Sequence, residues 1–106
     1  MINKKILGLL GLAARARKVA FGADSVKEEI IKNKAKLIIV SKDASDRTKE
    51  KFQKLCLEYN LPLIIDGGIE ELSKAIGKEN KATYAVKESN LANEIEKIYN
   101  GGEIIG

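Results

Sequence analysis

The chain has 106 residues, of which 44% are hydrophobic, and a formal net charge of +4 at pH 7. These values fit one compact domain with a hydrophobic core. The longest apolar runs, such as Leu37–Val40, are far shorter than the roughly 20 residues of a membrane-spanning helix, so no contact with a membrane is expected. The chain contains no histidine and a single cysteine. We therefore expect no metal site and no internal disulfide, and a reducing, cytoplasmic location is the simplest account.

Positive charge is concentrated in the first third of the chain. Residues 1–36 contain nine basic and three acidic residues, a net charge of +6, whereas the remaining residues contain 10 basic and 12 acidic residues, a net charge of −2. Such asymmetry is typical of a protein that binds a polyanion. The alternative is an ordinary lysine-rich surface that keeps the protein soluble.

In the first half of the chain, apolar spacing predicts two helices and two strands. A helix is expected over about 3–16, followed by a short strand over 18–21 that ends at Gly22. Asp24 or Ser25 can cap a second helix that extends to about residue 31. The branched run Leu37–Val40 suits a central strand that is buried on both faces.

In the second half, the same reasoning predicts three helices and two strands. Ser45 is a plausible N-cap for a helix that ends before Pro62. The further elements expected are a strand over 63–65, a helix over 69–76 that Gly77 ends, a strand over 82–86 and a helix around residues 91–98.

This alternation predicts an α/β fold, a three-layer α/β/α sandwich. We expect a mixed, mainly parallel sheet of about four strands, covered by about five helices. Residues 1–100 should form a single domain, and residues 101–106, with two glycines at their start, a flexible tail.

Candidate catalytic groups have simpler structural interpretations. Cys56 shares an apolar helical stripe with Phe52 and Tyr59, which favours a buried structural thiol over a nucleophile. Asp43 and Asp46 follow a strand and could bind a metal or act as a catalytic pair, but helix capping is the preferred interpretation. The glycine pairs match neither a P-loop nor a dinucleotide-binding fingerprint, so no nucleotide cofactor is expected.

The most informative segment surrounds Gly22, where a strand leads into a helix within the basic third of the chain. Free N–H groups at a helix N-terminus attract phosphate, and glycine lets another backbone approach closely. Asp24 and Ser25 in the first turn can meet base edges, while Lys27 and Lys32 can reach flanking phosphates. The alternative is a capped helix after a tight turn, with its lysines in solvent.

A second segment, residues 77–82, links a helix to the last predicted strand. It contains Lys78, Asn80 and Lys81. In a sheet covered on both faces, such a loop can lie beside the first strand–helix turn. Two lysines and an amide at that place could hold a nucleic-acid loop.

These segments together resemble the kink-turn RNA-binding ribosomal protein family, the large-subunit seven-Ae and thirty-e superfamily, and in particular its short bacterial YlxQ-like members. The resemblance extends over about residues 6–99 and is carried by Leu9–Lys18, Gly22, Ala35–Ser45, Leu61–Pro62 and Leu72–Lys78. It implies a non-catalytic protein without cofactors that binds kink-turns, which are sharp RNA bends built on tandem sheared G·A pairs. It also implies an association with ribosomal RNA, the ribosome or translation, and a monomeric state.

The family's recognition segment runs glycine, small residue, asparagine, glutamate, with a lysine further on. The matching positions here are Gly22, Ala23, Asp24 and Ser25, followed by Lys27. Asp24 thus replaces an amide, although its carboxylate can accept from guanine N1 or N2, and Ser25 replaces a carboxylate. The RNA-binding residues expected from the sequence and the resemblance are Arg15, Arg17, Lys18, Gly22, Ala23, Asp24, Ser25, Lys27, Lys78 and Lys81.

Two other classes of function remain as alternatives. A protein–protein adaptor could keep the fold and lose kink-turn recognition. The departures at Asp24 and Ser25 favour it, and the basic first third argues against it. An enzyme acting on RNA, such as a methyltransferase, would need a cofactor loop and a general base that the sequence does not offer.

Overall fold

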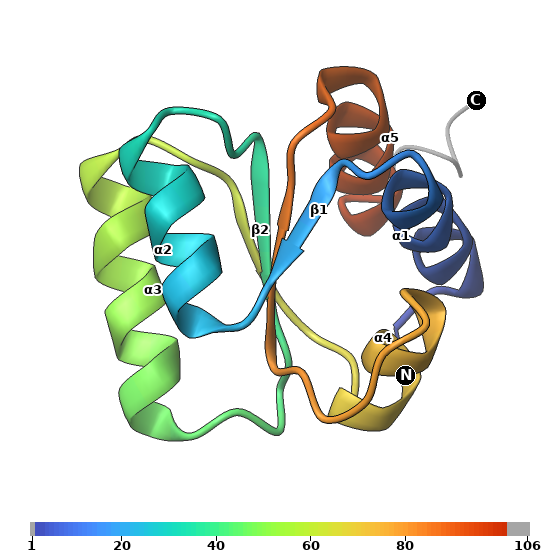
Figure 1. The fold of residues 1–106 in the computed structure, drawn as a ribbon, viewed down its shortest axis with the longest axis horizontal. Coiled ribbons are helices and arrows are strands. Elements are labelled where there is room, and N and C mark those ends of the chain that lie inside the picture. Colours follow the sequence, from blue (N-terminus) through green and yellow to red (C-terminus); the bar gives the residue numbers. More distant parts are fainter. Residues whose placement is uncertain (1, 102–106) are drawn as a thin grey trace.

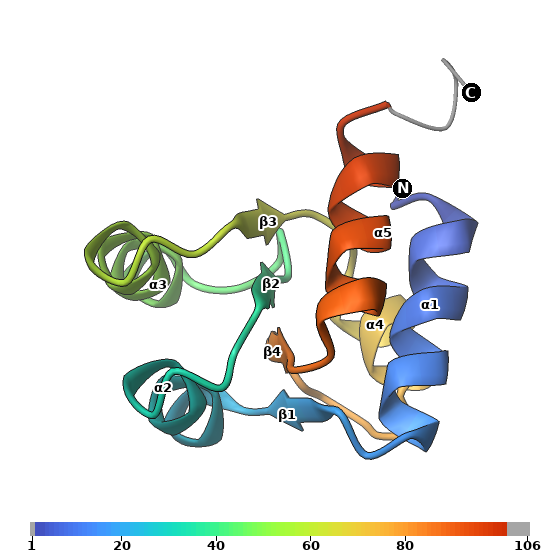
Figure 2. The same cartoon turned by 90° about the horizontal axis from the view of Figure 1, so that it is seen from above.

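The computed structural model describes residues 2–101 as an α/β/α sandwich (Figure 1). Helices α1, α4 and α5 cover one face of the sheet, and α2 and α3 cover the other (Figure 2). The predicted sandwich, with four strands and five helices, is confirmed. Its elements in chain order are α1 (Lys4–Arg15), β1 (Val19–Phe21), α2 (Ala23–Ile31), β2 (Leu37–Val40), α3 (Asp46–Glu58), β3 (Leu63–Ile65), α4 (Ile69–Ala75), β4 (Thr83–Val86) and α5 (Ser89–Tyr99).

The sheet is mixed, with strand order β1-β4-β2-β3. Only β2 and β3 pair in parallel, whereas β4 pairs antiparallel with both β1 and β2. The expectation of a mainly parallel sheet is therefore wrong for the strand pairings, although β1, β2 and β3 all point the same way. An alternation of helices and strands does not specify which strand is inserted between two others, and here the last strand enters between the first two.

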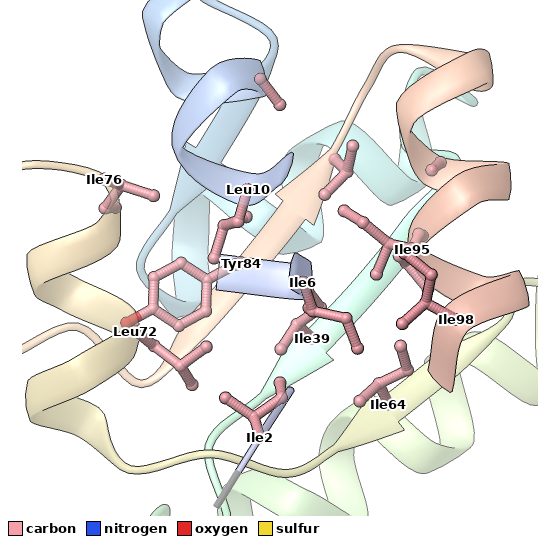
Figure 3. Close-up of a cluster of buried hydrophobic side chains, with 14 residues drawn as sticks. Ile2, Ile6, Leu10, Ile39, Ile64, Leu72, Ile76, Tyr84, Ile95 and Ile98 are labelled. Carbon is pink, nitrogen blue, oxygen red and sulfur yellow. The ribbon is translucent and has the colours of Figure 1, made fainter. Parts of the chain in front are cut away.

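Hydrophobic side chains form a core on each face of the sheet. Successive residues of a strand point to opposite faces, and all four residues of β2 and of β4 are buried. Ile39 and Tyr84 join the core beneath α1, α4 and α5. Figure 3 shows this core, to which α4 contributes Leu72. Ile38 and Ala85 join the core beneath α2 and α3. Burial on both faces explains why the central strands are uniformly apolar.

Local polar contacts define where several helices begin. Ser45 is the N-cap of α3, as predicted, and its Oγ accepts from the N–H of Thr48 at 3.1 Å. The N–H of Ile69 donates to Asp43 Oδ2 at 3.2 Å, so Asp43 satisfies the start of α4. The expectation that Asp24 or Ser25 caps α2 is wrong, because Gly22 occupies the N-cap position. The predicted tail covers residues 101–106, of which residues 102–106 lie outside the described residues.

Cys56 lies in the core between α3 and the sheet, with 4% of its surface exposed. Burial raises the pKa of its thiol to about 11. A thiol in this state is a small apolar group rather than a nucleophile, because the nucleophile is the thiolate. This placement confirms that the residue is buried.

We expect Cys56→Ala to lower the free energy of unfolding by about 1 kcal/mol, as truncation of a small core group does. Above the ordinary thiol pKa of 9.0, the unfolded chain releases a proton that the folded protein keeps until about pH 11. The wild-type protein should therefore lose stability as the pH rises through this window, and Cys56→Ala should lose less. Urea titrations of both proteins at pH 8 and pH 10.5 measure the difference. Equal losses of stability between these two pH values in the two proteins would contradict the prediction.

Candidate nucleic-acid interface

The turn from β1 into α2 depends on Gly22. Its φ is 88°, a conformation that residues with a side chain rarely adopt. Its N–H donates to the Thr83 carbonyl at 3.0 Å, which fixes the turn against the start of β4. A Cβ atom at Gly22 would meet no other atom within 4 Å. The turn therefore has open space in front of it, and the glycine is required by the backbone conformation.

The first turn of α2 is open to solvent. Helix geometry leaves the N–H groups of Ala23, Asp24 and Ser25 without intrahelical acceptors, and the N-cap Gly22 has no side chain that could accept from them. The side chains of Asp24 and Ser25 are both exposed. Asp24 lies in the first helical turn, where a negative charge is favourable for the helix dipole. This end of the helix can therefore offer N–H donors, one carboxylate and one hydroxyl to a ligand.

The loop between α4 and β4 lies beside this turn. The Nζ atoms of Lys78 and Lys81 are each 5.4 Å from the centroid of the Phe21 ring, within the range of a cation–π contact. Phe21 is the residue that precedes Gly22. The structure thus brings together the two segments that the sequence analysis had singled out separately, and it places two cations next to the open end of α2.

A buried hydrogen-bond network holds this loop in place. The N–H of Lys81 donates to Ser73 Oγ at 2.8 Å, and the hydroxyl of Tyr84 donates to the Lys81 carbonyl. Ser73 Oγ and Tyr84 Oη are themselves 3.1 Å apart. Burial raises the pKa of Tyr84, so its hydroxyl remains a neutral donor at physiological pH. The network fixes the backbone of Lys81, whose ammonium group lies over the Phe21 ring.

Sequence reasoning missed Phe21, Ser73 and Tyr84 as parts of this arrangement. Phe21 and Tyr84 were assigned only to strands, and Ser73 lies within an otherwise ordinary amphipathic helix. A serine that is 2% exposed in such a helix needs a buried partner. That signal depends on knowing the burial, which the sequence spacing does not provide.

The other expected residues divide between two ends of the sheet. Lys27 is exposed on α2, one turn beyond Ala23. Arg15, at the end of α1, lines a hollow together with Lys74 and Gly77, near the start of the loop before β4. Arg17 and Lys18 precede β1 and so lie at the opposite end of that strand from Gly22. The structure therefore does not place Lys18 at the Gly22 turn.

Two further observations concern other kinds of site. Within residues 2–101, no group of three or more cysteine, aspartate or glutamate side chains is arranged to hold a metal ion. The helices in this part of the chain are all too short or too polar to cross a membrane.

Comparison with known proteins identifies relatives along nearly the whole chain. Residues 4–96 match the model of the Ribosomal protein L7Ae/L30e/S12e/Gadd45 family. The RNA-binding protein YlxQ of Bacillus subtilis is 40% identical over 87 residues, which cover 82% of this chain and 87% of the relative. The RNA-binding protein YlxQ of Enterococcus faecium is 30% identical over 99 residues, which cover 93% of this chain and 95% of the relative.

Solved structures show the same architecture. A Bacillus halodurans protein of unknown function superimposes with a TM-score of 0.89 and 33% identity, over 92% of this chain and 99% of the other. The 15.5kD RNA binding protein of Giardia lamblia shares the fold, with a TM-score of 0.78 and 19% identity over 100% of this chain and 94% of the other. By its sequence and its fold, the chain belongs to the Ribosomal protein L7Ae/L30e/S12e/Gadd45 family.

Proposed function

We propose that this protein binds structured RNA without catalysis and recognises kink-turns. The observation that carries the proposal is the contact of Lys78 and Lys81 with Phe21, which sets two cations beside the open N-terminus of α2. The names of the two YlxQ relatives, both RNA-binding proteins, support the same conclusion.

Each part of the surface has a separate chemical task in this proposal. The N–H groups at the start of α2 bind a phosphate, helped by the dipole of the helix. Lys27, Lys78 and Lys81 neutralise neighbouring phosphates and set the orientation of the RNA without reading its sequence. Asp24 can accept hydrogen bonds from guanine N1 and N2 groups, as sheared G·A pairs would present them. Ser25 can donate to or accept from a base edge.

The proposal also covers the setting in which the protein acts. Its family includes ribosomal proteins, and we infer an association with ribosomal RNA, the ribosome or translation. The inference includes a monomeric state and a cytoplasmic location, and the single, buried cysteine supports the cytoplasmic location.

A protein–protein adaptor is the second candidate function. Asp24 and Ser25, at the positions where the family typically has an amide and a carboxylate, are the observation that favours it. On this alternative, the exposed first turn of α2 would contact another protein, and kink-turn affinity would be absent.

The proposed function predicts a preference for bent RNA together with strong salt dependence. Affinity falls as salt rises, and each phosphate contact should make the slope of log affinity against log salt more negative by roughly 0.7 to 0.9. Titrations between about 50 and 200 mM KCl with a kink-turn RNA and a straight duplex of equal length measure both properties. A flat salt response, or equal affinity for the two RNAs, would contradict the proposal.

Lys81→Ala should weaken binding to all RNAs alike and reduce the magnitude of the salt slope by about one, because it removes one phosphate contact. Lys54→Ala, an exposed lysine on α3, is the matched control for the loss of one positive charge. Isothermal or fluorescence titrations at several salt concentrations compare the two variants. The same slope for Lys81→Ala and Lys54→Ala would remove Lys81 from the interface.

Asp24→Asn should instead change selectivity, because it exchanges a charged acceptor for a neutral amide that can also donate. It restores the residue usual in the family, and we expect tighter binding to kink-turn RNA with little change for a straight duplex. Since Asp24 is not the N-cap, only its interaction with the helix dipole is lost, which costs less than about 1 kcal/mol of stability.

Measuring both kink-turn affinity and thermal stability for Asp24→Asn separates the two candidate functions. If the folded variant bound kink-turn RNA with unchanged affinity, Asp24 would not be part of an RNA site, and the adaptor would become the leading hypothesis.

A further inference from the structure

A second basic surface lies at the other end of the sheet from Gly22. Figure 1 shows the loops before β1, before β2 and after β4 gathered at the same, upper end of the molecule. They line an open hollow of about 410 Å³. Its lining residues come from all three loops and are Lys18, Asn33, Lys34, Lys36 and Lys87. We call this surface the lysine hollow.

Backbone hydrogen bonds hold the three loops of the lysine hollow together. The N–H of Lys87 donates to the Lys18 carbonyl, and the N–H of Lys36 donates to the Val86 carbonyl, both at 2.8 Å. Asn33 takes a left-handed conformation, with φ 59°, as the chain leaves α2. The four lysines are therefore anchored to a common framework rather than to independent flexible loops.

Nearby acidic residues compensate this charge only in part. Glu29 of α2 forms an ion pair with Lys87 at 3.1 Å, and both side chains are largely buried. Glu88 is occupied as the cap of α5, where its carboxylate accepts from the N–H groups of Asn90 and Leu91. Glu28 faces Lys32 in a pair on the exposed side of α2. Lys18, Lys34 and Lys36 thus remain without a described acidic partner, which favours an anion between them.

We propose that the lysine hollow binds the phosphate backbone of a second segment of the same RNA that is held at the Gly22 turn. This inference rests on the proposed function. β1 is the edge strand of the sheet, with one end at each surface. The four residue-to-residue steps from Lys18 to Gly22 span roughly 13 Å in extended backbone, so a stem that continues past the Gly22 turn along this edge reaches the lysine hollow. The lysines contact phosphates only, and they extend the footprint without reading bases.

The test compares two double variants with equal loss of charge. K34Q/K36Q removes two exposed cations from the lysine hollow, and K54Q/K97Q removes two exposed cations from α3 and α5. Each protein is titrated with a kink-turn RNA that has short stems and with the same kink-turn carrying extended stems, at several salt concentrations. Each protein is also titrated with a straight duplex, and the melting temperature of each variant is measured.

For the extended RNA, we expect K34Q/K36Q to lower affinity by roughly tenfold and the magnitude of the salt slope by about 1.5, since two contacts are lost. K54Q/K97Q should have a much smaller effect, and the two variants should bind the short-stem RNA equally. Equal behaviour of the two variants on the extended RNA would overturn the inference while leaving kink-turn recognition at Gly22 intact.

Failure of the proposed function has a different signature. The wild-type protein would then bind the kink-turn no better than the straight duplex. In that case the affinities for the straight duplex test the lysine hollow. A larger loss of affinity in K34Q/K36Q than in K54Q/K97Q retains the hollow as a phosphate site, and equal losses of affinity overturn it.

Discussion

The insertion of β4 between β1 and β2 is the constraint on which both basic surfaces depend. β4 pairs along its length with β1 on one side and β2 on the other, antiparallel to both. Its start therefore lies beside the end of β1, and its end lies beside the start of β1. The first arrangement brings Lys78 and Lys81 to Phe21, and the second brings Lys87 to Lys18.

Packing of β4 into both cores makes this arrangement rigid. Tyr84 and Ala85 are fully buried on opposite faces of the sheet. Ala85 is the cross-strand partner of Ala20, and these small side chains let α2 pack close to the sheet. Tyr84 has a second role, because its hydroxyl is bonded to the Lys81 carbonyl. One buried strand thus positions the start of α2 and the loop that faces it.

Charge that is clustered in the sequence is divided in space. The cations of the first third separate at β1, with Lys18 at one end of this strand and Lys27 on the helix that follows its other end. Each group is then joined by lysines from the second half of the chain. At the Gly22 turn these are Lys78 and Lys81, and in the lysine hollow the addition is Lys87. The electrostatic surface is therefore a product of the topology as much as of the composition.

The sequence by itself determined the order of helices and strands, the two-sided burial of Leu37–Val40 and the burial of Cys56, because these follow from the local periodicity of apolar residues. It also identified Gly22 as a glycine between a strand and a helix, and the structure shows that its positive φ requires this residue. Only the tertiary structure decided the direction of strand pairing, the capping of α2 and which lysines gather at each end of β1. The physical reason is that these depend on hydrogen bonds between segments far apart in the chain, such as Gly22 with Thr83 and Lys18 with Lys87. Local propensity is the same whichever strand becomes the neighbour.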